Sequence, residues 1–406
     1  MSSKLHLPLA SGSEPNPFGP LALLVIQPTP YCNLDCDYCY LPDRNNRSRL
    51  DLELLDPILE KVLSSPFIGR DFTLLWHAGE PLAVPPDFYD AATDRIRAAV
   101  ARHTPGLSID QSIQTNGILI DSKWCECFRR NDISVGVSLD GPAFLHDAHR
   151  RTRSGLGSHA ATLRGIQHLQ RENLPFHVIS VLTDESLDHA EAIFRFFVDH
   201  GIREVGFNME ETEGVNLQSS LDRPDSEARY KRFLYEFWDL VASEPGALNL
   251  REFETTCSLI YSEERLQDTD MNRAFVIINV DHQGNFSTFD PELLAVSTEE
   301  YGDFVLGNVR HDSLESVIST EKFQRMQRDM AAGVELCRSS CDYFGLCGGG
   351  AGSNKYWETG SFRTSETQAC RYRVKTVADV VMAGLERSLG VATTVATPGP
   401  TPSPCA

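Results

Sequence analysis

Apolar residues follow a repeating pattern along the chain from residue 21 to residue 209. Short apolar runs of strand length alternate with longer stretches in which apolar residues recur every three or four positions, the spacing of one helix face. In the first run every residue from 21 to 26 is apolar. Such a continuous run is typical of a strand that a parallel sheet buries on both faces. The pattern predicts strands at 21–27, 72–78, 107–114, 133–139, 176–182 and 204–209, and helices at 51–64, 86–101, 121–130, 158–173 and 188–200.

Six strands separated by helices predict six βα units, and therefore a parallel sheet with helices on its outer face. The alternation is lost after residue 210, so we favour a partial (β/α)6 TIM-like barrel over a full eight-unit barrel. A charged helical stretch follows at 224–243, then a strand at 274–280 and a hairpin turn at 281–285 that leads into 286–289. The fold class is thus α/β, with a small C-terminal cysteine-rich α+β domain.

Changes in composition divide the chain into five expected segments. The polar, Pro- and Gly-interrupted beginning predicts an arm without its own core, and the Ala/Thr/Pro-rich end predicts a disordered tail. The expected segments are an N-terminal arm at 1–20, the barrel at 21–215, a helical bridging segment at 216–273, the cysteine-rich domain at 274–389 and the tail at 390–406.

Charge and cysteine content narrow the function classes. The formal net charge of -20 opposes attraction to phosphate backbones and anionic lipids, so we expect neither nucleic acid nor a membrane as a partner. The sequence has neither a signal-peptide pattern nor an apolar run of the ~20 residues that span a bilayer, which predicts a cytoplasmic protein. Eleven cysteines in that compartment point to metal or redox chemistry rather than disulfides.

Three of these cysteines, Cys32, Cys36 and Cys39, are spaced C-x3-C-x2-C directly after the first predicted strand. Three thiolates on one loop can bind three irons of a [4Fe-4S] cube and leave the fourth iron open to a cofactor. The alternatives are a zinc knuckle, which normally needs a fourth nearby Cys or His, and a disulfide with a spare thiol. An odd triplet with no His inside the loop favours the cluster.

Polar residues and glycines also gather where the predicted strands end, at 76–81, 114–117, 138–142 and 207–211. Parallel barrels carry their functional groups at this end. Each group taken alone could be a βα turn in which Gly and Asx residues serve geometry only.

The cysteine triplet with Tyr38 resembles the radical S-adenosylmethionine (SAM) superfamily. The resemblance implies that the methionyl amine and carboxylate of SAM chelate the open iron, and that Tyr38 lies against the adenine. It also implies that Gly79 and Glu80 bind the methionyl amine, although Ala78 replaces the first glycine of the family's Gly-Gly-Glu motif. The other implied contacts are Gln114, Ser138 and Asn208 with the ribose or methionyl group and Arg164 with the carboxylate. A surface arginine is the ordinary alternative for Arg164.

Two further groups are interpreted as structural. The basic run at 146–153 is expected to be a solvated connection. Cys125 and Cys127 lie inside a predicted helix at positions that face different ways, so they are expected to be structural cysteines.

A second cysteine system comprises Cys337, Cys341, Cys347 and Cys370. Four thiolates satisfy tetrahedral zinc or all four irons of a cube. The segment resembles the SPASM extension of peptide-modifying radical enzymes, which favours an auxiliary [4Fe-4S] cluster. Two positions depart from that extension, because Phe289 and Ala351 stand where it has cysteines. We therefore expect one auxiliary cluster, with Cys257 as the only plausible stray ligand.

Residues 40–44 and 76–82 resemble maturases of glycine/serine-rich repeat and related cyclophane peptides. This implies an enzyme that removes a hydrogen from a side-chain β-carbon of a ribosomally made precursor peptide and joins that carbon to an aromatic ring. The implied partners are the precursor peptide and an electron donor such as flavodoxin or ferredoxin.

Asp290 follows the missing cysteine, at a position where anaerobic sulfatase maturases carry the aspartate that removes a substrate proton. It is therefore a candidate general base, and a turn residue before Pro291 is the alternative. The alternative functions are a sulfatase maturase that makes formylglycine and a non-catalytic zinc- or cluster-binding protein.

Overall fold

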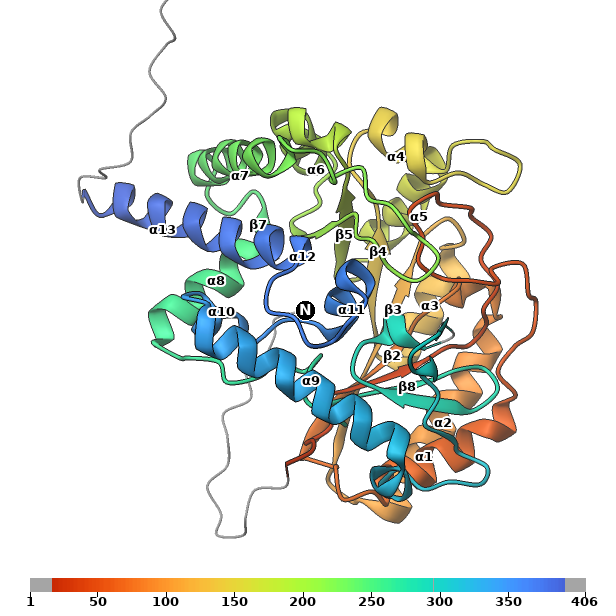
Figure 1. The fold of residues 1–406 in the computed structure, drawn as a ribbon. Coiled ribbons are helices and arrows are strands. Elements are labelled where there is room, and N and C mark those ends of the chain that lie inside the picture. Colours follow the sequence, from red (N-terminus) through yellow and green to blue (C-terminus); the bar gives the residue numbers. More distant parts are fainter. Residues whose placement is uncertain (1–16, 295, 391–406) are drawn as a thin grey trace, which may run out of the picture.

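The computed structural model describes residues 17–294 and 296–390 (Figure 1). The predicted tail from residue 391 onward, with Cys405, and most of the predicted N-terminal arm lie outside the described residues.

The six predicted parallel strands are present and pair in chain order. Their bounds are β1 Leu23–Ile26, β2 Asp71–Trp76, β3 Ser108–Thr115, β4 Ile133–Ser138, β5 Phe176–Leu182 and β6 Glu204–Met209. Register places Val25 beside Leu75, and Leu75 beside Ser112, so side chains of one face line up across the sheet. The partial barrel predicted from the apolar pattern is confirmed.

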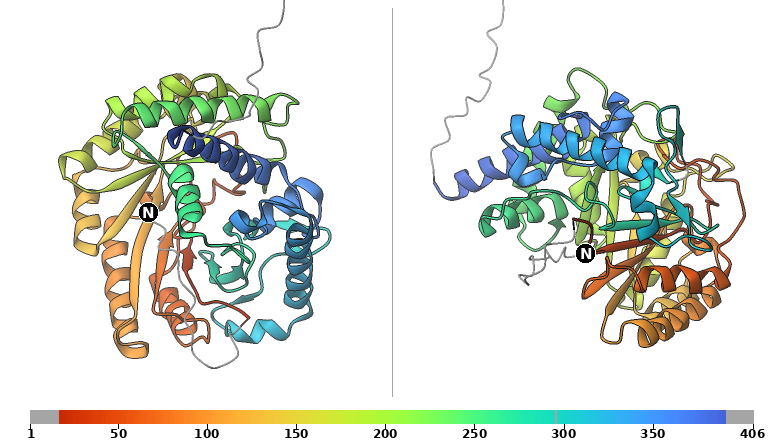
Figure 2. Two further views of the ribbon diagram at one scale, coloured as in Figure 1. Left: turned by 90° about the vertical axis from the view of Figure 1, so that its left-hand side faces the viewer. Right: turned by 60° about the horizontal axis from the view of Figure 1, so that its bottom comes forward.

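Helices cover the outer face of this sheet, as Figures 1 and 2 show. They are α1 Leu55–Leu63, α2 Pro86–His103, α3 Ser122–Asn131, α4 Ala143–His149, α5 His159–Arg171 and α6 Ala190–Asp199. The helices pack through their apolar faces. Helix α1, for example, buries Leu55, Ile58 and Val62. Cys125 and Cys127 are both fully buried on α3, which confirms their structural role. Helix α4 falls in a stretch where no helix was predicted.

After β6 the chain leaves the alternating pattern. Helix α7 Ser226–Ser243 is followed by the two-residue strand β7 Asn249–Leu250, which pairs parallel to β6, and by α8 Arg251–Ser262.

The predicted hairpin forms from β8 Ile277–Val280 and β9 Asn285–Thr288. Strand β8 pairs parallel to β1, so the hairpin extends the barrel sheet beyond its first strand. The further strands are β10 Ser297–Thr298, β11 Gly302–Asp303 and β12 Gly307–Asn308, of which β12 pairs with β9. The sheet order is β12-β9-β8-β1-β2-β3-β4-β5-β6-β7.

A long helix, α9, and several shorter ones then lead back across the molecule to the barrel. They are α9 Glu321–Ser340, α10 Phe344–Cys347, α11 Gly352–Thr359, α12 Gln368–Cys370, a π-helical turn Arg371–Thr376 and α13 Val377–Ser388. Helix α13 packs on α7 and α8 (Figure 2). A side chain at Gly384 would collide with the ring of Trp238, at 2.2 Å from Cε2, so glycine permits this close approach.

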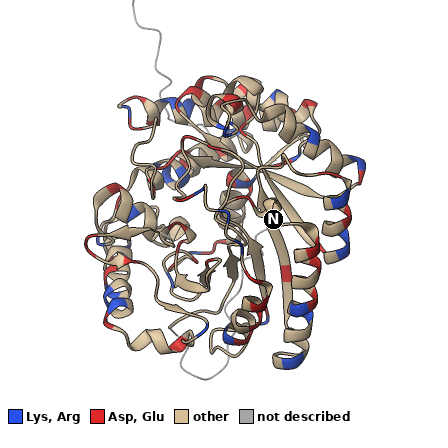
Figure 3. Cartoon of the chain, turned by 90° about the vertical axis from the view of Figure 1, so that its right-hand side faces the viewer, with Lys and Arg blue, Asp and Glu red and all other residues tan. Residues whose placement is uncertain are grey.

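Single 3-10 turns connect several of these elements, at Leu52–Leu54, Pro81–Ala83, Glu185–Asp188, Pro291–Leu293 and Glu315–Ser319. Charged residues lie mostly on the helices and loops around the sheet, with both signs interspersed (Figure 3). Among the described residues, no helix is long and apolar enough to cross a membrane.

Candidate active site around the cysteine loop

The loop that carries Cys32, Cys36 and Cys39 follows β1 and lies at the carboxyl end of the sheet. Burial, together with the charges of Glu80, Cys36 and Cys39, raises the pKa of Cys32 to about 12. Burial also raises the pKa of Cys36 to about 11, with Cys39 among the contributing neighbours. The three thiols therefore lie near one another, as a shared cluster requires.

Residues 146–153 pack along this loop and hold its backbone. The amide of Asp35 donates to the carbonyl of Arg151 at 2.7 Å, and the Arg153 guanidinium donates to the carbonyl of Cys32 at 2.8 Å. His146 and Arg150 in the same run are buried. The expectation of a solvated connection is therefore wrong for His146 and Arg150, which pack against the end of β4, whereas Arg151 and Arg153 are exposed as expected.

Tyr38 is tied to the barrel by a buried ion pair. Its hydroxyl donates to the carboxylate of Asp140. Two nitrogens of Arg150 donate to the same carboxylate at 2.8 and 3.1 Å. Burial alone would raise the pKa of Asp140, but the Arg150 guanidinium outweighs it and holds that pKa below its usual range. Asp140 was not singled out from the sequence, although the strand-end group at 138–142 contains it.

The turn after β2 fits closely under the cysteine loop. Ala78 and Gly79 both have positive φ, 68° and 70°. A Cβ on Gly79 would lie 2.2 Å from the carbonyl oxygen of Thr29, and the Glu80 amide donates to the carbonyl of Tyr31 at 2.7 Å. The missing side chain of Gly79 is thus what lets this turn approach the loop.

Both oxygens of the Glu80 carboxylate accept hydrogen bonds from the chain itself. It accepts from the Thr115 hydroxyl at 2.6 Å and from the amides of Asn116 and Leu82, each at 2.9 Å. Burial raises its pKa, while these three hydrogen bonds act in the opposite direction. The Asn116 side chain reaches back to Asn33 at 2.7 Å and to the Cys32 sulfur at 3.9 Å. Asn116 was not among the predicted contacts, although the strand-end group at 114–117 contains it.

Of the other predicted SAM contacts, Gln114 and Ser138 lie together. The Gln114 amide donates to the Ser138 hydroxyl at 3.1 Å. Asn208 accepts a hydrogen bond from Arg251 at 2.9 Å. Arg164 is exposed on α5, and the described contacts do not bring it to the other residues. The role of these residues toward SAM stays a prediction.

Four acidic side chains, Glu211, Glu213, Asp290 and Glu292, form a group that we call the carboxylate cluster. Arg373 contacts Glu211 at 3.3 Å. The Asn354 amide donates to Glu211 at 2.9 Å and to Glu213 at 3.4 Å. The cluster joins residues up to 81 positions apart in the sequence, and its partner Arg373 lies 162 positions after Glu211.

Asp290 is completely buried within this cluster. Its Oδ2 accepts from the Ser353 amide at 2.8 Å, and within the described part of the chain Oδ1 has no hydrogen-bond partner. Burial, followed by the charge of Glu292, raises the pKa of Asp290 well above its usual range. Burial also raises the pKa of Glu292 to about 7.

Tyr40 joins the carboxylate cluster to the cysteine loop. Its pKa is raised by burial first, and then by the charges of Glu292, Cys39 and Glu213. The Val215 amide donates to the Tyr40 carbonyl at 3.1 Å, so the loop after β6 packs directly on this residue. Tyr40 therefore lies where the charges of Glu213, Glu292 and Cys39 all act on it.

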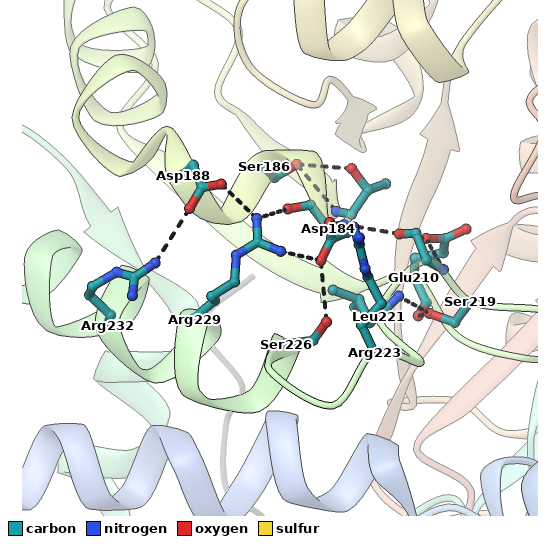
Figure 4. A network of polar contacts seen from close by, with 12 residues as sticks. Asp184, Ser186, Asp188, Glu210, Ser219, Leu221, Arg223, Ser226, Arg229 and Arg232 are labelled. Carbon is teal, nitrogen blue, oxygen red and sulfur yellow. Dashed lines mark hydrogen bonds and ion pairs between the residues drawn. The ribbon is translucent and has the colours of Figure 1, made fainter.

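A polar network fixes the loop that carries Glu211 and Glu213 (Figure 4). Asp184 pairs with Arg229 and Arg223, the latter at 2.8 Å, and its amide donates to the Ser220 hydroxyl at 2.9 Å. The Ser220 amide in turn donates to the Glu210 carboxylate at 2.9 Å. These bonds join the start of α7 to the end of β6.

The C-terminal cysteines also converge. Burial raises the pKa of Cys347 to about 11, and Cys370, Cys337 and Cys341 all contribute to the rise. Among the described residues, no three His, Cys, Asp or Glu side chains are placed to hold a single metal ion. A [4Fe-4S] cube takes one thiolate at each iron, so its four ligands surround a larger body. The pKa of Cys257, on α8, is raised by burial and Glu254 and not by the other thiols.

Apolar side chains fill the two positions where SPASM ligands were expected to be missing. Phe289 is completely buried at a positive φ of 70°, and Ala351 is buried directly before α11.

A groove of about 620 Å³ opens on the surface beside the carboxylate cluster. Its lining includes Thr212, Trp357 and Arg371. Thr212 stands between Glu211 and Glu213, and Arg371 stands two residues before Arg373. The groove thus borders the segments that form the cluster.

The comparisons with known proteins agree with this geometry. The model of the Radical SAM superfamily matches residues 26–197. The uncharacterized protein sll1766 of Synechocystis sp. is 57% identical over 376 residues, which is 92% of this chain and 94% of that protein. The chain belongs to the radical SAM superfamily. Radical SAM enzymes bind S-adenosylmethionine and a [4Fe-4S] cluster, and the converging triplet beside the Gly79 turn fits that pair of cofactors.

Two further radical SAM proteins resemble this one. The serine-type anaerobic sulfatase-maturating enzyme of Klebsiella aerogenes is 34% identical over 236 residues, which is 57% of this chain and 56% of that enzyme. The solved structure of native anSMEcpe with bound AdoMet and Cp18Cys peptide has a TM-score of 0.73 at 20% identity, covering 91% of this chain and 99% of that one. At 20% identity, the similarity to this solved structure shows a shared fold.

Proposed function

We propose that this radical SAM enzyme modifies a ribosomally made precursor peptide by joining a side-chain β-carbon to an aromatic ring carbon. The observation that carries the proposal is the position of Asp290. Asp290 is a completely buried carboxylate with a free oxygen, and the charge of its neighbour Glu292 acts on Tyr40 next to the cysteine triplet. In this proposal, Asp290 takes a proton from the substrate after the radical chemistry has begun.

The cofactors would supply the difficult chemistry: Cys32, Cys36 and Cys39 would hold the cluster that removes a hydrogen atom with SAM, and Cys337, Cys341, Cys347 and Cys370 would hold an auxiliary [4Fe-4S] cluster able to take up one electron. The residues of the chain position the groups. Glu80 and Asn116 hold the Gly79 turn against the cysteine loop, and the Asp140–Arg150 pair fixes Tyr38.

Asp290 accepts the ring proton in this proposal. Each crosslink removes two hydrogens from the peptide: one leaves as a hydrogen atom from the β-carbon, and the other leaves as a proton and an electron from the ring carbon after the bond forms. The raised pKa of Asp290 makes its ionised form a stronger base than an exposed carboxylate. The Ser353 amide holds Oδ2, which leaves Oδ1 for the proton.

A peptide substrate is supported by a similar fold that has been solved with the Cp18Cys peptide. The groove lined by Thr212, Trp357 and Arg371 gives an extended peptide a path along the segments that form the carboxylate cluster.

The second candidate function is oxidation of a protein Cys or Ser to formylglycine. It is supported by the 34% identity to a serine-type anaerobic sulfatase-maturating enzyme. Phe289 and Ala351 favour the crosslinking candidate, because they replace ligands expected for a second auxiliary cluster.

Coexpression with a short candidate precursor peptide that contains aromatic residues tests the two candidates. Crosslinking and serine oxidation both remove two hydrogens, so mass alone does not separate them. A crosslink suppresses backbone fragmentation between the two joined residues, whereas formylglycine reacts with an aldehyde probe. Probe labelling without a fragmentation gap would replace the crosslinking proposal by the second candidate.

Asp290→Asn tests the base. We expect at least a ~100-fold loss of crosslink formation, the usual size of a general-base contribution. Release of 5'-deoxyadenosine should continue, because hydrogen removal precedes the proton transfer. Asp303→Asn, at an exposed aspartate that pairs with Lys322, is the matched control and should keep full activity. Crosslinking at an undiminished rate in Asp290→Asn would reject the base assignment.

Iron, sulfide and zinc analysis of anaerobically purified protein tests the non-catalytic alternative. The proposal requires iron and sulfide for two cubes. Zinc in their place, with no 5'-deoxyadenosine released under a reductant, would make the protein a scaffold.

A further inference from the structure

Lys355, on α11, is an unusual residue for the interior of this protein. Only 4% of its surface is exposed. Its ammonium nitrogen lies 3.4 Å from the sulfur of Cys337. Among the described residues, no carboxylate lies within ion-pair distance of Lys355. The thiol of Cys337 is thus the acceptor that the structure gives to this buried cation.

Gly333, on α9, makes room for the Lys355 side chain. A Cβ on Gly333 would lie 3.1 Å from the ammonium nitrogen and 2.0 Å from the carbonyl oxygen of Phe362. Helix α9, which carries Gly333 and Cys337, can therefore approach α11 closely only because residue 333 is glycine. This packing fixes the lysine at the sulfur.

A buried ammonium group is costly unless a negative charge compensates it. A protonated thiol offers no charge, whereas a thiolate bound to iron does. The pairing of Lys355 with Cys337 is therefore the arrangement expected beside an anionic cluster ligand.

We propose that Lys355 donates a hydrogen bond to the Cys337 thiolate of the auxiliary cluster and raises the reduction potential of that cluster. This inference rests on the auxiliary cluster of the proposed function. Reduction adds one negative charge to the cluster, and a nearby positive charge and a hydrogen bond to sulfur both stabilise the more negative form. Lys355 thereby makes the cluster a better acceptor for the electron that the peptide gives up.

The nearest comparison inside the chain is Lys375. It lies in the same domain, but its ammonium group pairs with Glu366 at 2.7 Å at a partly exposed position. A carboxylate partner and solvent both screen its charge. Lys375→Met is therefore a matched control in which a lysine is removed near the cluster without removing a sulfur hydrogen bond.

The test measures the potential of the auxiliary cluster alone. In the full chain, Cys32, Cys36 and Cys39 are changed to Ala, which leaves about four irons per chain if the auxiliary cluster exists. Anaerobic redox titration followed by electron paramagnetic resonance then compares Lys355 with Lys355→Met, Lys355→Gln, Lys355→Arg and the Lys375→Met control.

We expect reduction to become at least tenfold less favourable in Lys355→Met, which is a fall of about 59 mV for a one-electron couple. Lys355→Gln, which keeps a donor without charge, should fall between Met and Lys, and Lys355→Arg should stay near the parent. Lys375→Met should shift the potential much less.

Each outcome decides one claim. Absence of iron from the parent of this series would overturn the auxiliary cluster and with it the proposed function. Iron at the parent level with an unchanged potential in Lys355→Met would overturn the tuning role alone. Loss of iron in both neutral variants would also overturn it, because Lys355 would then be a structural requirement.

Discussion

Burial governs the carboxylate cluster at the scale of single residues. Glu213, Asp290 and Glu292 all have raised pKa values, and burial is the first cause for each. Arg373 offsets part of the negative charge, and Glu211 is the main reason that the pKa of Arg373 is raised. Burial therefore costs the folded state stability whenever these carboxylates are ionised, and the same cost makes ionised Asp290 a stronger base.

Glu292→Gln should reveal this cost. Because the folded protein holds the Glu292 proton up to pH about 7 and the unfolded chain releases it near pH 4.3, stability falls as pH rises through this window. The variant should gain about 3 kcal/mol more at pH 8 than at pH 4.5, because the window lies between these two values. Anaerobic denaturant titration at the two pH values measures the difference. An equal gain at both values would contradict the raised pKa.

Arg150→Met should show the opposite linkage through Asp140. The change leaves a buried carboxylate unpaired and should cost about 3–5 kcal/mol at neutral pH. Because the pairing lowers the pKa of Asp140, its contribution is present above the unfolded value near 3.9 and is lost as pH falls below it. Thermal unfolding measures the loss, and the double variant Arg150→Met with Asp140→Leu should recover part of it. No recovery would mean that Arg150 acts through other contacts.

The turn between β2 and the following 3-10 helix is the element whose geometry is most demanding. Gly79→Ala should destabilise the protein by at least about 2 kcal/mol, because its Cβ would meet the Thr29 carbonyl in a backbone conformation that L residues avoid.

Ala78→Gly is the matched variant in the same turn. It should be neutral or stabilise the protein by up to about 1 kcal/mol, since alanine at a φ of 68° is strained. Melting temperature and iron content of both variants check the pair. Equal tolerance of the two changes would show that the turn can move away from the cysteine loop.

Elements of the barrel were predictable because their signal is local. Apolar runs and helical spacing located the six strands and the outer helices, and the strand-end rule pointed to the segments that hold Glu80 and Asn116. Helix α4 escaped this reasoning, because its short stretch has no extended apolar face. Arg150 was interpreted as solvated because its sequence neighbours are polar. Its contacts with Asp140 and Tyr38 come from other segments and are visible only in the fold.

Pairing between distant segments has no local signal, and at the scale of the whole molecule this limits prediction most. The hairpin β8–β9 was visible in the sequence, but its alignment with β1 was not. The carboxylate cluster likewise joins residues on either side of α7 and α8, and Glu213 and Glu292 were not predicted as members. The chemistry of Cys337 beside Lys355 depends in the same way on the packing of α9 against α11.

The shared sheet predicts that the C-terminal part is needed for the barrel to fold. Strand β1 lies between β2 and β8, and removal of β8 would expose its hydrogen-bonding edge along a fully apolar run. A chain ending at residue 273 should therefore be recovered mainly as aggregate, whereas a chain ending at residue 390 keeps every described element and should be recovered as folded protein. Soluble yield, size-exclusion chromatography and circular dichroism compare the two. A soluble, cooperatively unfolding 1–273 fragment would show instead that the barrel is an independent domain and that β8 merely docks on it.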